Sequence, residues 1–590
     1  MKKYFYLSFI LLFVYSNIFA QSDYSKYMQI KKLFLLEEYE QIVNSDISIT
    51  INSEFYPYKT FYKAVSLFKV NQFKKSLDNF HNLKKNYPNW SQIEEVNYWI
   101  IKILIETNNL NDALKVFSTI SNIEIKKNLY NIIDPKVSKI LSFSELEILY
   151  NKYPKNISIS KYFGRRLLDE FINEEVRQEI NKILKIVDKD QLFISSEEKF
   201  KVAVLLPLMY ESLENTFYIQ NNKFIVDFYS GLLHGLNNQD STNSLIEILP
   251  FDTKKNPDVI KQIISSGKLS NVDLIIGPLY SNPISLIKQY CLENKIMMIN
   301  PLSNNNEIID DNKYSLLFNP SIKTIANKVA NYSIERFKNN KNTILFYEKK
   351  YADSLIAKIY QDKLNAEGFN IIYSQGVSLE DSRLILDSLT NSYEYILSDS
   401  LYDTLKSIEG RFVKDGRGID GVDTLYKYEE KFYIEDDSIG HVFISSKNSL
   451  LASNAISAVD IRNDTIPIIG FDEWLDFDLI TIDQFENLDI SLISSSFINF
   501  ESDKFIKLQD YYIKNYRNKI SKNFLLGSEL INLIFNIVKD YGKYFQFGLR
   551  NEKFIQGNVL YGFEYLENND NQIVPIVKVD SSKIKMINQY

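Results

Sequence analysis

The spacing of apolar residues divides the chain into two parts with different rhythms. From residue 21 to about 195, apolar residues recur every three or four positions and Gly and Pro are scarce, which predicts amphipathic helices. From residue 200 onward, short apolar runs alternate with amphipathic stretches, and Lys201–Leu208 (KVAVLLPL) is almost continuously apolar, as in a strand buried on both faces. This alternation predicts a doubly wound α/β fold behind an all-α part, with a domain boundary in the polar segment 195–199.

A repeated pattern runs through the helical part. Three segments share one turn pattern and follow one another: residues 36–43, 70–77 and 107–114. An aromatic or aliphatic residue follows each turn, at Tyr39, Phe73 and Leu110, with offsets of 34 and 37 residues. The pattern resembles the tetratricopeptide repeat, in which a small residue such as Ala64 lets two helices approach and a proline such as Pro88 ends the second. The resemblance implies a scaffold or a surface for a protein partner over 21–195, and a generic helical bundle is the alternative.

The first twenty residues have the features of a secretory signal. A basic start, Met1–Lys3, is followed by an apolar run over Tyr4–Val14, and Ala20 precedes Gln21. The run is shorter than the roughly 20 apolar residues that a membrane span needs. We therefore predict a signal peptide over 1–20, a periplasmic or otherwise extracytoplasmic location, and no transmembrane segment after cleavage.

Composition and motifs exclude several classes of function. The net charge is −7, from 68 basic and 75 acidic residues, which disfavours a nucleic-acid partner. A single Cys, Cys291, and three scattered His predict no disulfide framework, no metal and no cofactor. Residues 416–421 fit the GxGxxG pattern, but no apolar strand precedes them, so we interpret 405–440 as a loop insertion. No nucleophile elbow, HExxH or CxxC motif is present, and we expect no enzymatic activity.

The part after residue 200 contains a series of apolar motifs: KVAVLLPL, FYSGLLHGL, DLIIGPLYSNP and IMMINPLSNNN, then NTILFY, HVFISS and IPIIGFDEW. Together these motifs resemble the type I periplasmic binding proteins, the fold of the branched-chain amino-acid receptors. The resemblance implies lobe one over about 200–323 plus late helices over 500–545, and lobe two over 324–490 plus a C-terminal hairpin over 557–579. Gly231 and Gly235, four residues apart, predict a helix that packs closely on a sheet.

In that family the ligand lies between the lobes, held by hydroxyl and backbone N–H groups at strand ends and helix N-termini. The positions that match the family pattern, and that we predict as ligand-binding, are Ser281, Asn282, Asn300, Ser303, Asn304, Tyr351 and Asp472. Asn282 is also placed to cap a helix beginning at Pro283. For each position a purely structural role, as a cap, turn or packed surface residue, is the alternative. Tyr280 is bulky where many amino-acid receptors carry a small residue, and could narrow the site.

Two functions remain open. The first is an exported, non-enzymatic binding protein that holds a small amino-acid-like solute between its lobes for an ABC-type uptake or sensing system. The second follows from the overall layout, which resembles the outer-membrane lipoprotein activators of penicillin-binding proteins and implies a regulator of peptidoglycan synthesis that contacts an envelope protein. The chain departs from that pattern because no lipid-accepting Cys lies near Ala20.

Overall fold

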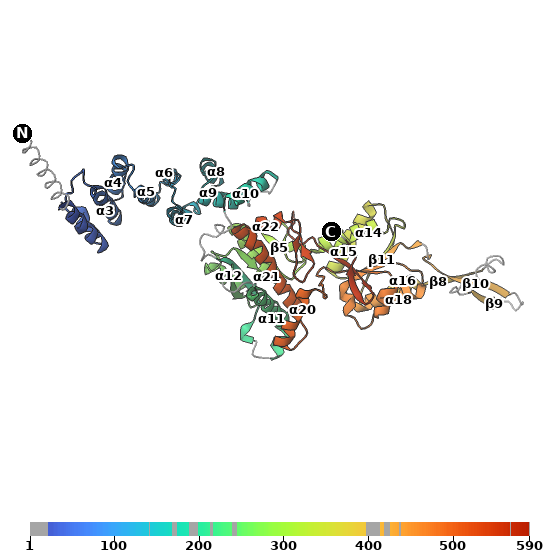
Figure 1. The fold of residues 1–590 in the computed structure, drawn as a ribbon. Coiled ribbons are helices and arrows are strands. Elements are labelled where there is room, and N and C mark those ends of the chain that lie inside the picture. Colours follow the sequence, from blue (N-terminus) through green and yellow to red (C-terminus); the bar gives the residue numbers. More distant parts are fainter. Residues whose placement is uncertain are drawn as a thin grey trace, which may run out of the picture. The chain divides into compact units, whose positions relative to one another are not determined.

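The computed structural model describes residues 22–140, 142–167, 174–187, 199–212, 216–238, 245–396, 413–417, 425–435, 438–566 and 568–588. The chain forms two compact units, Met1–Glu198 and Lys199–Tyr590. The described part of the first unit is helical, and the second unit contains two large sheets with helices (Figure 1). The predicted fold class, an all-α array followed by a two-lobed α/β domain, is confirmed.

The first unit is a series of short helices joined by tight turns. After a helix over residues 22–35, the helices are α2 (Tyr39–Asn44), α3 (Tyr56–Lys69), α4 (Phe73–Asn86), α5 (Ile93–Glu106), α6 (Leu110–Phe117), α7 (Ile123–Val137), α8 (Phe143–Lys152), α9 (Ile157–Leu167) and α10 (Glu174–Ile186).

The three aligned segments adopt one common turn. Glu37, Asn71 and Asn108 occupy the same place in it, with φ of 59°, 59° and 60°. In each turn the following N–H donates to a carbonyl five residues back, as Gln72 does to Leu67 at 2.8 Å. This left-handed turn ends the first helix and starts the second, so the repeat seen in the sequence is a structural repeat.

Helices α3 and α4 pack closely because small residues lie where they meet. Ala64 and Ser76 are fully buried, and the Ser76 hydroxyl donates to the Ala64 carbonyl at 2.6 Å across the pair. Helix α4 ends at Asn86, directly before Tyr87-Pro88. The small residue and the proline stop therefore have the roles predicted for them.

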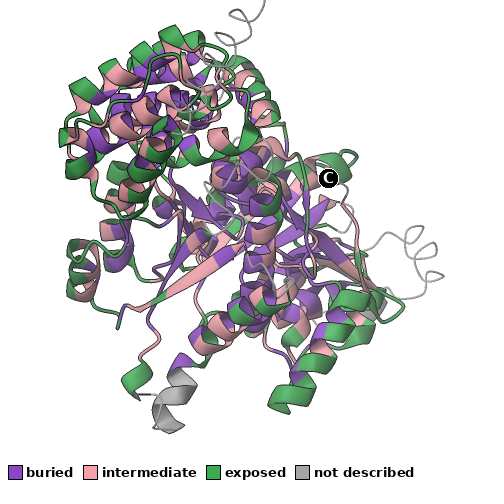
Figure 2. Ribbon diagram, turned by 60° about the vertical axis from the view of Figure 1, so that its left-hand side comes forward, coloured by how far each residue is buried: buried purple, intermediate pink, exposed green. Residues whose placement is uncertain are grey.

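Lobe one of the second unit is built on a five-stranded parallel sheet in the order β2-β1-β3-β4-β5. Its strands are β1 (Phe200–Leu206), β2 (Ile246–Asp252), β3 (Leu274–Ile276), β4 (Met297–Asn300) and β5 (Ser315–Leu317). Its helices are η2 (Tyr210–Ser212), α11 (Thr216–Asn237), α12 (Pro257–Ser265), α13 (Ser281–Asn294) and η3 (Asn306–Ile308), then α20 (Asp503–Tyr516), α21 (Lys522–Tyr541), η6 (Gly542–Tyr544) and α22 (Phe545–Asn551). Strands β1, β3, β4 and β5 are almost wholly buried, and for β1 the apolar run at 201–208 predicted this. Figure 2 shows many strands in the colour of buried residues.

Lobe two is built on a seven-stranded sheet in the order β17-β16-β13-β12-β11-β6-β7. Its strands are β6 (Asn342–Glu348), β7 (Asn370–Val377), β11 (His441–Ser445), β12 (Ile468–Phe471), β13 (Ile490–Ile493), β16 (Ile576–Asp580) and β17 (Lys583–Met586). Its helices are α14 (Ile322–Arg336), α15 (Tyr351–Ala366), α16 (Leu384–Thr390), α18 (Ser449–Arg462), η5 (Asp472–Asp476) and α19 (Ile482–Asn487). The parallel part, β7-β6-β11-β12-β13, repeats the strand order of lobe one, and the antiparallel β16 and β17 extend it.

The Gly231–Gly235 stripe on α11 packs against a helix, not against a sheet as predicted. A Cβ atom built on Gly231 would lie 2.0 Å from the Phe524 carbonyl oxygen of α21, and one on Gly527 would lie 2.0 Å from the Phe228 carbonyl oxygen of α11. Helices α11 and α21 therefore touch backbone to backbone. The stripe indicated a close approach correctly, but the element that makes the approach is far away in the sequence.

Two other predictions about late segments need correction. Part of the predicted loop 405–440 is sheet: β9 (Val413–Arg417) and β10 (Leu425–Phe432) pair antiparallel, and β10 also pairs with β8 (Ser392–Ile396), which precedes that loop. The glycines at 418 and 421 of the GxGxxG pattern lie outside the described residues. The predicted final hairpin is in fact two pairs, a short one of β14 (Ile555–Gln556) with β15 (Gly562–Phe563) and the hairpin β16–β17.

Candidate functional site

Polar side chains meet at the carboxyl edge of the lobe-two sheet. Glu348 ends β6, Ser445 ends β11, Asp472 follows β12 and Ser494 follows β13. Because these strands are parallel neighbours, their ends lie along one edge. The strand order reverses between β6 and β11, and ligands of doubly wound sheets bind at such a switch point.

Four carboxyl groups and two ammonium groups gather at this edge, and we call them the acidic cluster: Glu348, Asp353, Asp472, Glu473, Lys350 and Lys447. Its formal charge is −2 if all six are ionised, and Lys522, at the start of α21, adds one positive charge close to Asp472.

Glu348 is held by two neighbouring side chains. Its side chain is 5% exposed, pairs with Lys350 at 2.6 Å and accepts a hydrogen bond from the Ser446 hydroxyl at 2.8 Å. The neighbouring Ser445 hydroxyl donates to the Asp353 carbonyl at 2.9 Å, which ties the start of α15 to the end of β11. These bonds fix Glu348 and Asp353 in place before any ligand arrives.

Asp353 and Asp472 are difficult to ionise. Burial raises the pKa of Asp353 to about 6, and the charge of Glu348 adds to this rise while Lys350 and Lys447 oppose it. Burial also raises the pKa of Asp472 to about 6, against the opposing charge of Lys522 and a 2.6 Å hydrogen bond from the Ser494 hydroxyl. A cationic group placed beside these acids would favour their ionised forms and would itself be stabilised.

Glu473 differs from its neighbour because a lysine pairs with it. Burial acts to raise the pKa of Glu473, but its ion pair with Lys447 leaves that pKa below the ordinary value. Around neutral pH the edge therefore keeps ionised carboxylate at Glu473.

A buried tryptophan packs beneath the carboxyl ends of β11 and β12. Trp474 is fully buried, and its indole N–H donates to the Ser446 carbonyl at 2.9 Å. Gly470 lies directly against the ring, since a Cβ built there would come within 2.1 Å of it. The Gly470–Trp474 contact thus positions the β11 and β12 ends together.

On lobe one, the predicted loop residues after β4 mainly hold the loop itself. Asn300 is fully buried; its amide donates to the Pro278 carbonyl at 2.9 Å and its oxygen accepts the Ser303 N–H at 2.9 Å. The Ser303 hydroxyl accepts the Asn305 N–H at 3.1 Å, and the Asn304 carbonyl accepts the Ile322 N–H at 2.9 Å. The structure thus gives Asn300 the structural role that was the alternative for it, and leaves Ser303 and Asn304 partly exposed in the loop.

The predicted side-chain cap on helix α13, which precedes β4, is wrong. Helix α13 begins at Ser281, two residues before Pro283, and its N-cap is Tyr280, with no side-chain hydrogen bond to the cap. Pro283 falls in the first turn, where a missing N–H costs no helical hydrogen bond. Ser281 and Asn282 are consequently exposed first-turn residues, beside Tyr280 at 36% exposure.

The structure brings only some of the predicted residues together. Asp472 lies in the acidic cluster, whereas Tyr351, the first residue of α15, is 68% exposed. Sequence reasoning missed Glu348 and Asp353. A signal for Glu348 was present, because a carboxylate directly ends the apolar strand NTILFYE. Asp353 could be found only through the packing of α15 on β11.

Two observations identify the fold of the second unit. The parallel strands of both large sheets follow the same order, and a family model matches part of the sequence. Residues 235–406 match the family model described as the receptor family ligand binding region. The domain from Lys199 has the type I periplasmic binding protein-like fold. An uncharacterized protein of Methanocaldococcus jannaschii is 23% identical over 184 residues, which are 30% of this chain and 43% of that relative, so the match spans less than half of it.

Among solved structures, this binding protein-like domain is similar to two substrate-binding proteins. An ABC transporter substrate-binding protein from Desulfitobacterium hafniense, in complex with Leu, matches with a TM-score of 0.40 and 13% identity over 66% of this chain and 100% of its own. A putative branched-chain amino acid ABC transporter protein from Rhodospirillum rubrum has a TM-score of 0.46 and 10% identity, with the same coverage. Full-length LpoA from Haemophilus influenzae matches with a TM-score of 0.42 and 10% identity over 97% of this chain and 95% of its own.

Two kinds of feature are absent from the described residues. In that part of the chain, no helix combines the length and apolar character needed to cross a membrane. Nor do three His, Cys, Asp or Glu side chains come together there in an arrangement able to hold a metal ion.

Proposed function

We propose that the protein is an exported, non-enzymatic binding protein whose second unit holds a small solute bearing an amino group, with that group against the acidic cluster. The observation that supports this most is the excess of negative charge at the switch point of the lobe-two sheet. Four carboxyl groups face Lys350, Lys447 and Lys522 there, which leaves a formal charge of −1, and burial holds the pKa of Asp353 and Asp472 near 6. An ammonium group would supply the charge that the edge lacks.

The other end of such a solute would meet lobe one. Ser281 and Asn282 present the first turn of α13, where backbone N–H groups and the helix dipole favour a carboxylate. Ser303 and Asn304 are partly exposed in the neighbouring loop. An amino-acid-like zwitterion would therefore place its ammonium group against the acidic cluster of lobe two and its carboxylate against the first turn of α13 in lobe one.

A thermal-shift screen of amino acids and small peptides against the mature chain tests this function. A ligand that binds only the folded form raises the melting temperature as its concentration grows. For the solute found, Asp472→Asn should weaken binding about tenfold or more at pH 7.5, because one charge-assisted hydrogen bond is worth about 1.5–3 kcal/mol. Asp258→Asn, which changes an exposed acid on α12, is the matched control and should bind normally. If no compound with an amino group shifts the midpoint, the proposed function fails.

A second candidate function, contact with an envelope protein such as a peptidoglycan synthase, is favoured by one feature of the helical unit. Large apolar side chains are exposed near its start, with Leu35 at 72%, Leu36 at 60% and Ile51 at 67% exposure. Contiguous exposed apolar groups, such as the neighbours Leu35 and Leu36, are typical of protein interaction surfaces.

The second candidate is tested with a purified penicillin-binding protein from the same cells and the full mature chain. Leu35→Ser with Leu36→Ser should abolish co-purification, while Leu479→Ser, at a position 60% exposed on lobe two, should leave it intact. Equal retention of both variants would count against this surface.

A further inference from the structure

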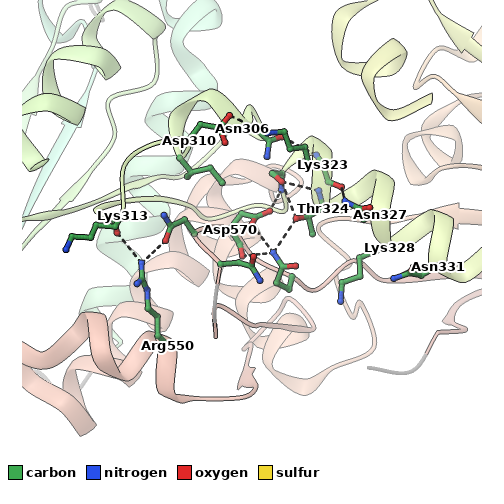
Figure 3. Close-up of a pocket in the computed structure, with 15 residues that line it drawn as sticks. Asn306, Asp310, Lys313, Lys323, Thr324, Asn327, Lys328, Asn331, Arg550 and Asp570 are labelled. Carbon is green, nitrogen blue, oxygen red and sulfur yellow. Dashed lines mark hydrogen bonds and ion pairs between the residues drawn. The ribbon is translucent and has the colours of Figure 1, made fainter. Parts of the chain in front are cut away.

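A concave site lies where the chain crosses from lobe one to lobe two. This crossover pocket has a volume of about 640 Å³ and is bordered by η3, the first turns of α14, the end of α22 and residues 568–572 (Figure 3). It is separate from the acidic cluster, which lies at the carboxyl ends of β6, β11 and β12. Its volume lies within the range of small-molecule sites, about 300–1,000 Å³.

The wall of the crossover pocket is fixed by hydrogen bonds between segments far apart in sequence. The Ser321 N–H donates to Asp570 at 2.9 Å, and the Lys323 N–H donates to the Asn306 side chain at 3.1 Å. Gln572 joins the same wall, donating to Asp570 at 2.8 Å. These bonds join the start of α14 to Asn306 of lobe one and to the late segment 570–572.

The lining carries more positive than negative charge. Its four cationic side chains are Lys313, Lys323, Lys328 and Arg550, and its two acids are Asp310 and Asp570, which leaves a formal charge of +2. Asp570 already accepts bonds from the wall, and Asp310 pairs with Lys323 at 3.4 Å, with both side chains about half exposed. A pair that is so exposed contributes little, so Lys323 remains available to an anion.

Arg550 is positioned at one end of the crossover pocket. Its guanidinium donates to the Lys313 carbonyl at 3.1 Å and to the Asn569 side chain at 2.7 Å. Burial lowers the pKa of Arg550 below its ordinary value. An anion beside it would offset this loss of solvation. Figure 3 shows Lys328 and Asn331 at the other end, so a ligand would be held from both ends.

The rest of the lining is polar and rich in amides. Of its fifteen residues six are Asn or Gln and only one, Ile309, is aliphatic. Carboxamides both donate and accept hydrogen bonds, which suits hydroxyl groups, whereas an apolar ligand would find no matching surface.

From this charge and lining we propose that the crossover pocket binds a small, soluble anion rich in hydroxyl groups, such as a sugar phosphate or a sugar acid. The ligand's anionic group meets Lys323, Lys328 or Arg550, and its hydroxyls meet the carboxamides. Because the walls come from both lobes, the ligand stabilises one arrangement of the crossover segments. This inference is independent of the proposed function.

Isothermal titration calorimetry with the full mature chain tests the site, with glucose 1-phosphate and glucuronate as anionic probes and glucose as the neutral probe. At least one anion should bind, more weakly as the salt concentration rises, and glucose should give no heat of binding. Lys323→Gln with Lys328→Gln should weaken the anion at least tenfold, equivalent to about 1.4 kcal/mol. Both residues lie on the accessible side of α14, so the variant should fold.

The matched control is Lys507→Gln with Lys514→Gln, which removes the same charge from exposed positions on α20. It should bind the anion as the unmodified chain does, and so should Asp472→Asn, whose change lies in the acidic cluster. The proposal is overturned if neither anion binds, if glucose binds equally well, or if the two lysine variants lose affinity to the same extent.

Discussion

Single buried carboxyl groups set how the binding protein-like domain responds to pH. Asp353 and Asp472 have pKa values raised to about 6, and burial raises the pKa of Glu529 on α21 to about 7, although it accepts backbone N–H groups from Asn558 and Val559. A raised carboxyl pKa means that the folded state holds the proton more tightly than the unfolded state. The resulting stability is fully present below the unfolded pKa of about 4 and is lost as pH rises through 6 to 7.

Asp472→Asn removes one buried carboxyl group that is costly to ionise, and it keeps the shape of the side chain. The Ser494 hydroxyl can still donate to the amide oxygen. We expect the variant to gain up to about 3 kcal/mol of unfolding free energy over the parent at pH 8, because two pKa units correspond to about 2.7 kcal/mol. At pH 4 the two proteins should be equally stable. Urea unfolding at both pH values measures this, and an equal gain at pH 4 would show that ionisation is not the cause.

The residues of the site were only partly predictable, for a physical reason. Asp472 could be found because it directly follows an apolar strand, and a parallel strand's end is a ligand edge. Asn300 lies at an equivalent place in lobe one, yet its amide bonds to Pro278 and Ser303. Sequence alone does not reveal whether a polar group at a strand end faces a ligand or its own loop, since that depends on contacts between separate loops.

Among the elements, strands and repeat turns were predicted well, and long-range partners were not. The apolar runs of β1 and β4 and the turns at Glu37 and Asn71 are local patterns, so sequence reveals them. Gly231 shows the limit: its spacing indicated close packing, but the partner α21 lies nearly 300 residues later.

Gly231→Ala should separate α11 from α21. The new methyl group would overlap the Phe524 carbonyl, at 2.0 Å, so the helix backbones must move apart. Overpacking of this kind costs about 1–3 kcal/mol, and the midpoint of urea unfolding should fall accordingly. Leu233→Ala, on the exposed side of the same helix, is the control and should change the midpoint much less. If the two variants unfold alike, the close helix contact contributes nothing to stability.

Gly470→Ala tests the support of the acidic cluster by the same logic. A methyl group there would collide with the Trp474 ring at 2.1 Å and push its indole away from the Ser446 carbonyl. We expect a change in tryptophan fluorescence together with weaker binding of the amino-group ligand. Unchanged fluorescence would mean that the ring adapts without leaving its place.

At the scale of the whole molecule, the two units should be separable. The division between Glu198 and Lys199 falls at the segment where the hydrophobic rhythm changes. A chain starting at Lys199 contains both sheets and their helices, so it should fold and unfold in a cooperative transition of its own. Circular dichroism with urea measures this. A fragment that stays unfolded while the full chain is folded would show that the units share a core.

The signal peptide prediction concerns residues 1–20, which lie outside the described residues. If the chain is exported, protein isolated from the cell envelope should begin at Gln21, because Ala20 ends the predicted cleavage site. N-terminal sequencing decides this. Recovery of an intact Met1 would contradict export by this signal.

The pairing of α11 with α21 also constrains how the protein is made. All five strands of the lobe-one sheet are complete at Leu317, but α21 begins only at Lys522. Whether the chain emerges from a ribosome or from an export channel, the apolar face of α11 lacks this partner until the residues between Leu317 and Lys522 have also emerged. During that interval the nascent lobe is a client for chaperones. A message truncated between these two points should therefore yield a product that is degraded or aggregates, rather than a free-standing first lobe.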